Sequence, residues 1–274
     1  MKIITNTLFS RISAYGQILA SGALIFSFLP PFLSSPASLA FAPAKEGALK
    51  ALSAPVKSPI SLVNAFFGEG VSASVSQPII DKQIALVSTR DAFPASLSVI
   101  RKNEAMIRAA ADKYGVPTDV AIGVSLLENG GSETAVSSAG ALGVFQLMPG
   151  TARSLGLTVN KKVDERKDVE KNIDAGVSYL KMNYDRFGDW GLATWAYHAG
   201  EGNVMKALAL YKKSGGTGTP TIHKLLSSAA VKPMTKKLSD DSAGYPYKVI
   251  ATATLFRQAA SGSAAIPGSV ADNN

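Results

Sequence analysis

The chain has 274 residues, of which 46% are hydrophobic, so it is long and apolar enough to bury the core of one large domain or two small ones. It contains no cysteine, which excludes a lipid-anchored cysteine, a disulfide framework and a cysteine-based metal site. The formal net charge of +8 is compatible with an anionic partner or with solubility alone, but the lysines are not interleaved with aromatics, which argues against a nucleic-acid site.

Residues 1–40 have the pattern of a secretory signal peptide. Basic residues near the start precede an apolar stretch, and a small-x-small site follows at Ser38 to Ala40. Pro30 and Pro31 interrupt the stretch, which makes it poor as a membrane-spanning helix of about 20 residues. We therefore expect cleavage and export to the periplasm or cell envelope. The alternative is an uncleaved segment that anchors the chain in the membrane.

Residues 41–98 are rich in Ala, Ser, Pro and Val, a composition typical of a linker or a poorly ordered arm. The prolines recur too often for long helices; they are Pro43, Pro55, Pro59, Pro78 and Pro94. One short apolar piece, residues 60–67, fits a helix that docks on a partner or on the chain's own domain. The sequence leaves both alternatives open.

A compact helical domain is expected over residues 99–260. Apolar residues at helical spacing predict a helix over residues 99–114. A second predicted helix runs from Thr118, which offers the N-cap, to the glycine at Gly130. Glu128 therefore lies on the last turn of an apolar helix.

Four more helices are expected further along the chain, followed by a disordered tail. The tail, residues 261–274, is small and polar with one proline. The clearest of the helices has apolar positions that step by four and three residues until Gly188 closes it. The four predicted helices cover residues 173–187, 190–197, 204–211 and 247–259.

Glu128 occupies an unusual place, because two glycines follow within three residues of the helix end. Most glutamates at such a position face solvent, so the residue type alone favours an ordinary surface carboxylate. The functional alternative is a general acid. Leu126 and Leu127 would desolvate the carboxyl group and favour its neutral form, while Gly130 and Gly131 would let a substrate approach the backbone.

Three sequence blocks decide between these alternatives. The chain reads AVSSAGALGVFQLMPGTA over residues 135–152, NIDAGVSYL over 172–180 and AYHAG over 196–200. In this order they resemble the lysozyme-like domain of soluble lytic transglycosylases, glycoside hydrolase family 23. In that family a glutamate stands seven residues before the Ala-x-Ser step, as Glu128 stands before Ala135. The resemblance covers about residues 99–260 and implies a mainly α, lysozyme-like fold with short irregular or β segments.

The resemblance also implies roles for individual residues. The family's catalytic glutamate falls on Glu128, its substrate-holding glutamine on Gln146 and its site tyrosine on Tyr197, whose hydroxyl would orient the glutamate. A second family tyrosine, in a Tyr-x-x-x-Val pattern before the last helix, falls on Tyr245, with Tyr247 as the alternative.

Further residues are expected to line the substrate cleft. Gly143 would admit close approach of the substrate, and Phe145 would stack on an apolar sugar face. The chain departs from the family at Asn129 and His198, where serine and asparagine are usual; both replacements keep hydrogen-bonding ability and are expected near the substrate. His198 and His223 are the two histidines, too few for a metal site of this kind, and no metal or cofactor is expected.

The implied reaction uses one carboxylate, whereas glycoside cleavage ordinarily uses two. Glu128 would protonate the oxygen between N-acetylmuramic acid and N-acetylglucosamine, then take the proton of the muramyl C6 hydroxyl as a 1,6-anhydro ring closes. A hydrolytic muramidase with Glu133 or Asp189 as second carboxylate is one alternative. A non-catalytic peptidoglycan-binding or secretion-assembly protein is another.

The expected partner is the glycan strand of peptidoglycan. An envelope or secretion-complex protein is a further candidate partner, held through residues 41–98. No nucleic acid is expected, and a membrane is expected only if the signal peptide stays uncleaved.

Overall fold

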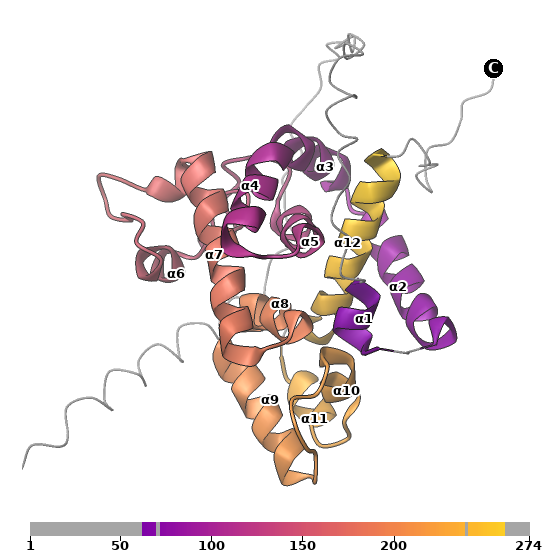
Figure 1. The fold of residues 1–274 in the computed structure, drawn as a ribbon. Helices are drawn as coiled ribbons and strands as arrows, with labels where there is room; N and C mark the ends of the chain where they lie inside the picture. Colours follow the sequence, from indigo (N-terminus) through magenta and orange to yellow (C-terminus); the bar gives the residue numbers. More distant parts are fainter. Residues whose placement is uncertain (1–61, 70–71, 239–240, 261–274) are drawn as a thin grey trace, which may run out of the picture.

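A computed structural model describes residues 62–69, 72–238 and 241–260 (Figure 1). The predicted signal peptide and the predicted C-terminal tail lie outside these described residues, as do residues 41–61 of the predicted arm. Within the described part, no helix combines the length and the apolar character needed to cross a membrane.

The described residues are mainly α-helical, as predicted. Short β contacts occur as isolated bridges that join Val136 to Leu142, Leu142 to Leu147 and Val159 to Asp164. Two short 3-10 helices cover Glu165–Lys167 and Ser242–Gly244. The α-helices are α1 (Leu62–Phe67), α2 (Ala73–Ser88), α3 (Phe93–Lys102), α4 (Glu104–Tyr114), α5 (Thr118–Glu128), α6 (Pro149–Ser154), α7 (Val169–Phe187), α8 (Trp190–Ala199), α9 (Glu201–Lys213), α10 (Ile222–Ser227), α11 (Lys232–Thr235) and α12 (Tyr245–Ala260).

Helix α5 lies at the centre, because it is apolar on every side. All residues from Val120 to Leu127 are buried, as expected for a helix that is hydrophobic all round. Helix α12 crosses α5 closely: a Cβ on Gly123 would lie 2.5 Å from the carbonyl oxygen of Val249. The hydroxyl of Thr252 donates to the carbonyl of Gly123 at 2.7 Å. The two helices run antiparallel, so the start of α12 lies beside the end of α5.

The long helix α7 forms where the apolar spacing predicts it. Asp168 caps its start by accepting a hydrogen bond from the N–H of Lys171, and Gly188 ends it in the left-handed conformation at φ 69°. Helix α8 follows after two residues, Gly188 and Asp189, and ends before Gly200, whose φ is 82°. Helix α12 begins at Tyr245, two residues earlier than predicted.

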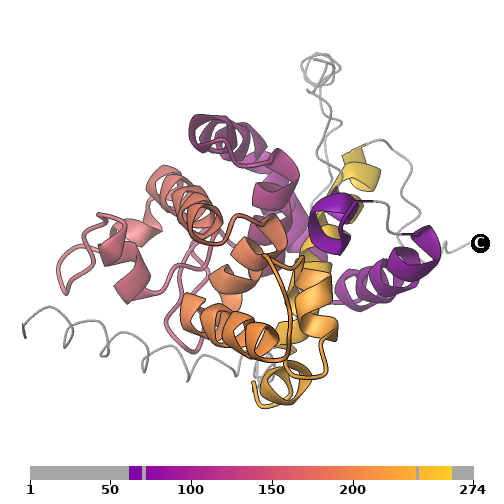
Figure 2. The same ribbon diagram turned by 60° about the horizontal axis from the view of Figure 1, so that its bottom comes forward.

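The structure differs from the prediction of a poorly ordered arm from residue 62 onward. Helices α1 and α2 pack beside α12, as Figures 1 and 2 both show. Phe66 is fully buried, so the apolar piece predicted over residues 60–67 docks on the chain's own domain from residue 62. Pro94 lies in the first turn of α3, where a missing N–H costs nothing. Burial of residues such as Val87 outweighs the composition that favoured a linker.

The helix predicted over residues 99–114 is two helices, α3 and α4, because Asn103 interrupts it. The side-chain amide of Asn103 donates to the carbonyl of Val99 at 2.9 Å and to Glu133 Oε1 at 2.6 Å. Asparagine readily bonds to nearby backbone in this way and so favours helix ends. The N-cap predicted at Thr118 is also displaced, since α5 begins at Thr118 without a side-chain cap.

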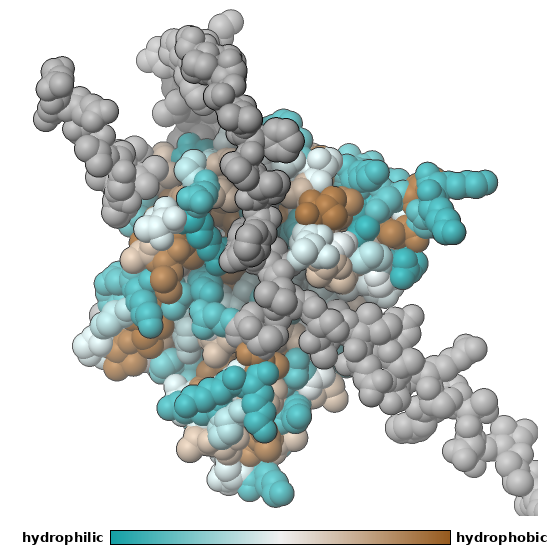
Figure 3. Space-filling view, turned by 180° about the vertical axis from the view of Figure 1, so that it is seen from behind, coloured by the Kyte–Doolittle hydropathy of each residue, from teal (hydrophilic) through white to brown (hydrophobic). Residues whose placement is uncertain are grey.

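The apolar side chains of these helices form one shared core. On the surface seen from behind in Figure 3, the apolar residues of the described part are scattered among hydrophilic ones. The arrangement leaves the end of α5 and the start of α12 as the place where polar groups meet inside the domain.

Candidate active site

Glu128 and Tyr245 are joined directly, although they are far apart in the sequence. The Tyr245 hydroxyl donates to Glu128 Oε1 at 2.6 Å. Tyr245 is only 4% exposed. Burial, and next the negative charge of Glu128, hold the pKa of Tyr245 well above its usual range. The tyrosine therefore remains a protonated donor to the glutamate, which supports its predicted place in the site.

Tyr197 lies near Glu128 but is hydrogen-bonded elsewhere. Its hydroxyl donates to the carbonyl of Phe145 at 2.6 Å, so the predicted hydrogen bond to the glutamate is not the one present. Burial raises the pKa of Tyr197 well above its usual range, with the charge of Glu128 as the next cause. Tyr197 thus fastens the loop over residues 135–147 beside the glutamate.

Gln146 closes that loop on itself. Its backbone is left-handed at φ 45°, an uncommon conformation for a residue other than glycine. Its side-chain Nε2 donates to the carbonyls of Ala135 and Gly143, both at 2.9 Å. These bonds use the amide nitrogen and leave Oε1 without a partner among the described residues. The carbonyl oxygen is therefore the part of Gln146 that can accept a hydrogen bond from a ligand.

The ring of Phe145 does not have the cleft role predicted for it, and Gly143 lies against a side chain of the protein. Phe145 is fully buried, and its ring occupies the space above Gly176, where a Cβ would lie 2.3 Å from Phe145 Cγ. A ring in that position cannot stack on a sugar. Gly143 is also buried, and a Cβ there would lie 2.2 Å from Nδ2 of Asn172. The missing Cβ of this glycine makes room for the side chain of Asn172, and approach of a substrate to its backbone stays a prediction.

Asn172 holds the loop from behind, a role that the sequence analysis missed. Its Oδ1 accepts the N–H of Phe145 at 2.9 Å, while its Nδ2 donates to the carbonyls of Leu142 and Arg166 at 2.9 and 3.0 Å. The residue is fully buried, so each bond satisfies a group that water cannot reach. Its position at the start of the NIDAGVSYL block was the available signal.

Arg166 fixes the same loop from another side. Its Nη1 donates to the carbonyls of Gly140 and Leu147 at 2.7 and 2.9 Å, and its Nη2 lies 2.7 Å from Asp164 Oδ2. The guanidinium is buried and paired, as a buried charge must be. No local sequence pattern distinguishes this arginine from a surface one.

Asn129 and His198, the two departures from the family pattern, both contact other groups of the protein. Asn129 is 4% exposed, its Oδ1 accepts the N–H of Gly131 at 2.8 Å, and its Nδ2 donates to the carbonyl of Ser132 at 3.1 Å. It shapes the turn after α5, so the predicted substrate contact does not fit this side chain. The ring of His198 stacks on Tyr245, with ring centroids 4.2 Å apart and planes 9° apart. His198 therefore supports the tyrosine that bonds Glu128.

Neither of the alternative carboxylates is placed as a partner of Glu128. Glu133 accepts from Asn103 and pairs with Lys102 Nζ at 3.0 Å, and these hydrogen bonds lower its pKa. Asp189 caps α8 by accepting the N–H of Leu192 at 2.7 Å; burial raises its pKa to about 6. It lies at the start of α8, whereas Tyr197 lies near its end, about 12 Å further along the helix at 1.5 Å per residue.

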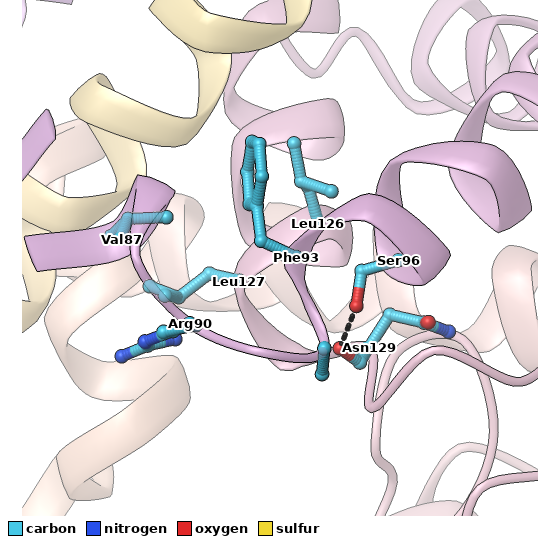
Figure 4. Close-up of a pocket in the computed structure, with 8 residues that line it drawn as sticks. Val87, Arg90, Phe93, Ser96, Leu126, Leu127 and Asn129 are labelled. Carbon is cyan, nitrogen blue, oxygen red and sulfur yellow. Dashed lines mark hydrogen bonds between the residues drawn. The ribbon is translucent and has the colours of Figure 1, made fainter. Parts of the chain in front are cut away.

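Arg90 is a neighbour of the glutamate that the sequence analysis did not anticipate. It lies in the turn between α2 and α3 and lines a small pocket with Leu127 and Asn129, the residues on either side of Glu128 (Figure 4). Burial lowers the pKa of Arg90, and the charge of Glu128 is the largest of the effects that oppose this. A cation thus lies close to the candidate catalytic carboxylate.

No group of three or more histidine, cysteine or carboxylate side chains that could hold a metal ion occurs among residues 62–69, 72–238 and 241–260. The polar groups of the site are therefore the glutamate, the buried Tyr245, the half-buried Tyr197, a glutamine carbonyl and an arginine. This set can exchange a proton and accept hydrogen bonds from a neutral substrate.

Residues 105–217 match the family model described as the transglycosylase SLT domain. A transglycosylase of Enterobacteria phage PRD1 is 34% identical over 151 residues, which cover 50% of this chain and 55% of the relative. The membrane-bound lytic murein transglycosylase D of Escherichia coli K12 is 33% identical over 110 residues, which cover 40% of this chain and 24% of that protein. The chain thus spans about half of one relative and about a quarter of the other.

Solved structures give a weaker likeness. The lytic transglycosylase Slt of Pseudomonas aeruginosa is 23% identical, with a TM-score of 0.45 over 59% of this chain and 25% of that one. The soluble lytic transglycosylase Slt70 of Escherichia coli is 24% identical, with a TM-score of 0.44 over 56% of this chain and 23% of that one.

Two residues near Glu128, Arg90 and Tyr245, lie outside residues 105–217, the range that the family model matches.

Proposed function

We propose that this chain, whose residues 105–217 form a transglycosylase SLT domain, is a lytic transglycosylase that cleaves the glycan strands of peptidoglycan. The bond cleaved is the β-1,4 linkage between N-acetylmuramic acid and N-acetylglucosamine. One observation carries the proposal: Glu128, at the end of the buried helix α5, is held by the protonated hydroxyl of Tyr245 at 2.6 Å.

Glu128 acts first as a general acid and then as a general base. In the first step it gives its proton to the glycosidic oxygen, and the bond from that oxygen to C1 of the muramyl residue breaks. In the second step the carboxylate takes the proton of the C6 hydroxyl, whose oxygen forms a bond to C1. The products are a 1,6-anhydromuramyl end and a free hydroxyl on the N-acetylglucosamine, and no water is consumed.

The surrounding residues stabilise the glutamate between these two steps. Tyr245 donates a hydrogen bond to the carboxylate, and hydrogen bonds to charged groups are stronger than those to neutral ones. Gln146 presents its Oε1 to the N–H of an N-acetyl group, while its Nε2 fixes the loop. Tyr197 joins that loop to α8. The site therefore combines one proton carrier with a rigid hydrogen-bonding frame.

A hydrolytic muramidase is the first alternative, and the positions of the other carboxylates favour it less. Such an enzyme ordinarily needs a second carboxylate to act as nucleophile or to activate water. Glu133 is engaged with Lys102 and Asn103, and Asp189 caps α8. Retention of Glu128 together with Tyr245 argues against the second alternative, a binding or secretion-assembly protein without activity.

The proposed localisation of the enzyme follows from its proposed substrate, because peptidoglycan lies in the cell envelope. The name of the Escherichia coli relative, membrane-bound lytic murein transglycosylase D, refers to a membrane and to murein, and the signal-peptide pattern of residues 1–40 agrees with export. We place this chain in the envelope, with the periplasm as the compartment. A protein partner held through residues 41–98 remains a prediction.

Digestion of purified peptidoglycan tests the function. Wild type should release muropeptides with 1,6-anhydro ends, detected by mass spectrometry as products lacking one water. Glu128→Gln should keep the fold and abolish release, because the amide cannot donate and retrieve the proton. Release of reducing ends by wild type would favour the muramidase instead. Full activity of Glu128→Gln would remove Glu128 from its role.

A further inference from the structure

The α2–α3 segment, residues 73–102, is fastened to the end of the helix that carries Glu128. The buried hydroxyl of Ser96 donates to the carbonyl of Asn129 at 2.7 Å. A Cβ placed on Gly131 would lie 3.0 Å from Cβ of Ala95, so α3 also lies against the turn that follows α5. These contacts fix the turn between α2 and α3 relative to the glutamate.

Arg90 lies in this turn, and its position is set by backbone hydrogen bonds on both sides. Its N–H donates to the carbonyl of Val87 at 3.1 Å, and its carbonyl accepts the N–H of Phe93 at 2.9 Å. Val87 and Phe93 are buried, and they line the same pocket as Leu127 (Figure 4). The backbone of Arg90 is therefore held in a well-packed segment, and its side chain starts from a fixed point at the pocket that Leu127 and Asn129 also line.

The charged and titratable groups that face Arg90 come from three parts of the fold. Glu128 is the largest electrostatic influence, and Tyr245 and Asp241 follow. On the other side, the groups near Glu128 are the hydroxyl of Tyr245, Arg90, and the neutral Tyr197, whose pKa is raised by burial and next by the charge of Glu128. A guanidinium stays protonated throughout the working range of an enzyme, so it acts as a fixed positive charge.

We propose that Arg90 is a positioning residue of the reaction, whose fixed charge stabilises the carboxylate form of Glu128. The inference rests on the proposed function, in which Glu128 becomes an anion when the glycosidic bond breaks and stays one until it takes the C6 proton. A preorganised cation beside a half-buried anion lowers the energy of that state at no reorganisation cost. The α2–α3 segment is thus part of the active unit, although it precedes the matched domain.

A neutral residue at position 90 should change the pH dependence in a defined direction. The reaction starts from protonated Glu128, and the positive charge favours loss of that proton. Without the charge, the glutamate keeps its proton to higher pH, so the alkaline limb of the kcat profile should move up by about one pH unit. At lower pH, where the glutamate is protonated in both proteins, kcat should fall about 10-fold, because the anion formed in the first step is less stabilised.

The test compares Arg90→Gln, Arg90→Lys and a control, Lys82→Gln, each in the full chain. The exposed Lys82 lies on α2, so its replacement removes one positive charge from the same segment away from the glutamate. Release of anhydro-ended muropeptides is measured from pH 4 to pH 9, with kcat and KM separated. Arg90→Gln should show the shifted limb and the lower kcat, whereas Arg90→Lys and Lys82→Gln should keep the wild-type limb.

Several outcomes would overturn the inference. An unchanged limb in Arg90→Gln would show that its charge does not act on Glu128, and a rise in KM alone would make it a substrate contact. If Arg90→Gln does not fold, Arg90→Met takes its place as the neutral variant, and an unchanged limb in that variant overturns the inference in the same way. A limb that moves in Arg90→Lys, which keeps the charge, also contradicts the proposal. Absence of anhydro products from wild type would instead overturn the proposed function.

Discussion

Replacing Tyr245 with phenylalanine is the sharpest test of the site, because it removes one oxygen atom and little else. The hydroxyl that donates to Glu128 Oε1 at 2.6 Å is lost. The ring keeps its stacking partner, His198, and its buried place at the start of α12. The substitution therefore leaves the half-buried carboxylate of Glu128 with one donor fewer and creates no large cavity.

The size of the effect follows from the kind of bond removed. A hydrogen bond to a charged group contributes about 1.5–3 kcal/mol. If this bond is realised mainly when Glu128 is a carboxylate, its loss raises the barrier by that amount, and kcat should fall about 10- to 100-fold. Since the donor also favours the carboxylate over the acid, the alkaline limb of the pH profile should move to higher pH.

The same helix offers a matched control. Tyr247 is also partly buried, but its hydroxyl bonds Nδ1 of His223 at 3.0 Å and not the glutamate. Tyr247→Phe should therefore keep wild-type kcat in the assay of anhydro-muropeptide release, while thermal melting confirms that both variants are folded. Wild-type kcat in Tyr245→Phe would refute the reasoning, as would an equal loss in Tyr247→Phe, which would make Tyr247 the functional tyrosine.

Two further predictions concern the stability of the fold. Asn172→Ala removes three buried hydrogen bonds and leaves the N–H of Phe145 unpaired. It should lower the free energy of unfolding by about 3 kcal/mol or more, which thermal melting would show as a Tm about 10 °C below that of wild type. A Tm within about 2 °C of the wild-type value would contradict the role of Asn172 in holding the loop. Asp189, whose pKa is raised from 3.8 to about 6 in the folded chain, binds its proton more tightly when folded. The free energy of unfolding of wild type, compared with that of Asp189→Asn, should therefore decrease as the pH rises from about 4 to 6 and stay constant above pH 6. A difference in Tm between the two proteins that does not change with pH would contradict this prediction.

Local pattern was sufficient for much of the fold. The spacing of apolar residues and the closing glycine at Gly188 predicted most of α7, and the uniform apolar character of the helix before Glu128 predicted its burial. These features depend on residues within a few turns of one another, so a sequence contains them directly. The resemblance then selected Glu128 from a position where a surface glutamate was the ordinary expectation.

The N-terminal helices escaped prediction because their stability comes from distant contacts. Composition and recurring prolines favoured a poorly ordered arm, yet the chain from residue 62 packs against α8, α10 and α12. Burial of Phe66 supplies free energy that no local propensity contains. The same holds for the break at Asn103, whose side chain bonds Glu133, thirty residues away.

By itself the sequence predicted the buried helix that ends at Glu128 and, through the family resemblance, proposed this glutamate as the proton carrier. Only the tertiary structure determined which side chains surround Glu128. Tyr245 lies 117 residues from Glu128 in the sequence, and the antiparallel crossing of α5 and α12 brings them together. Arg90 arrives through the packing of α2 and α3, and Phe145 turns inward because Gly176 leaves room for its ring. Periodicity reports which face of a helix is buried, but only packing determines which side chains meet there.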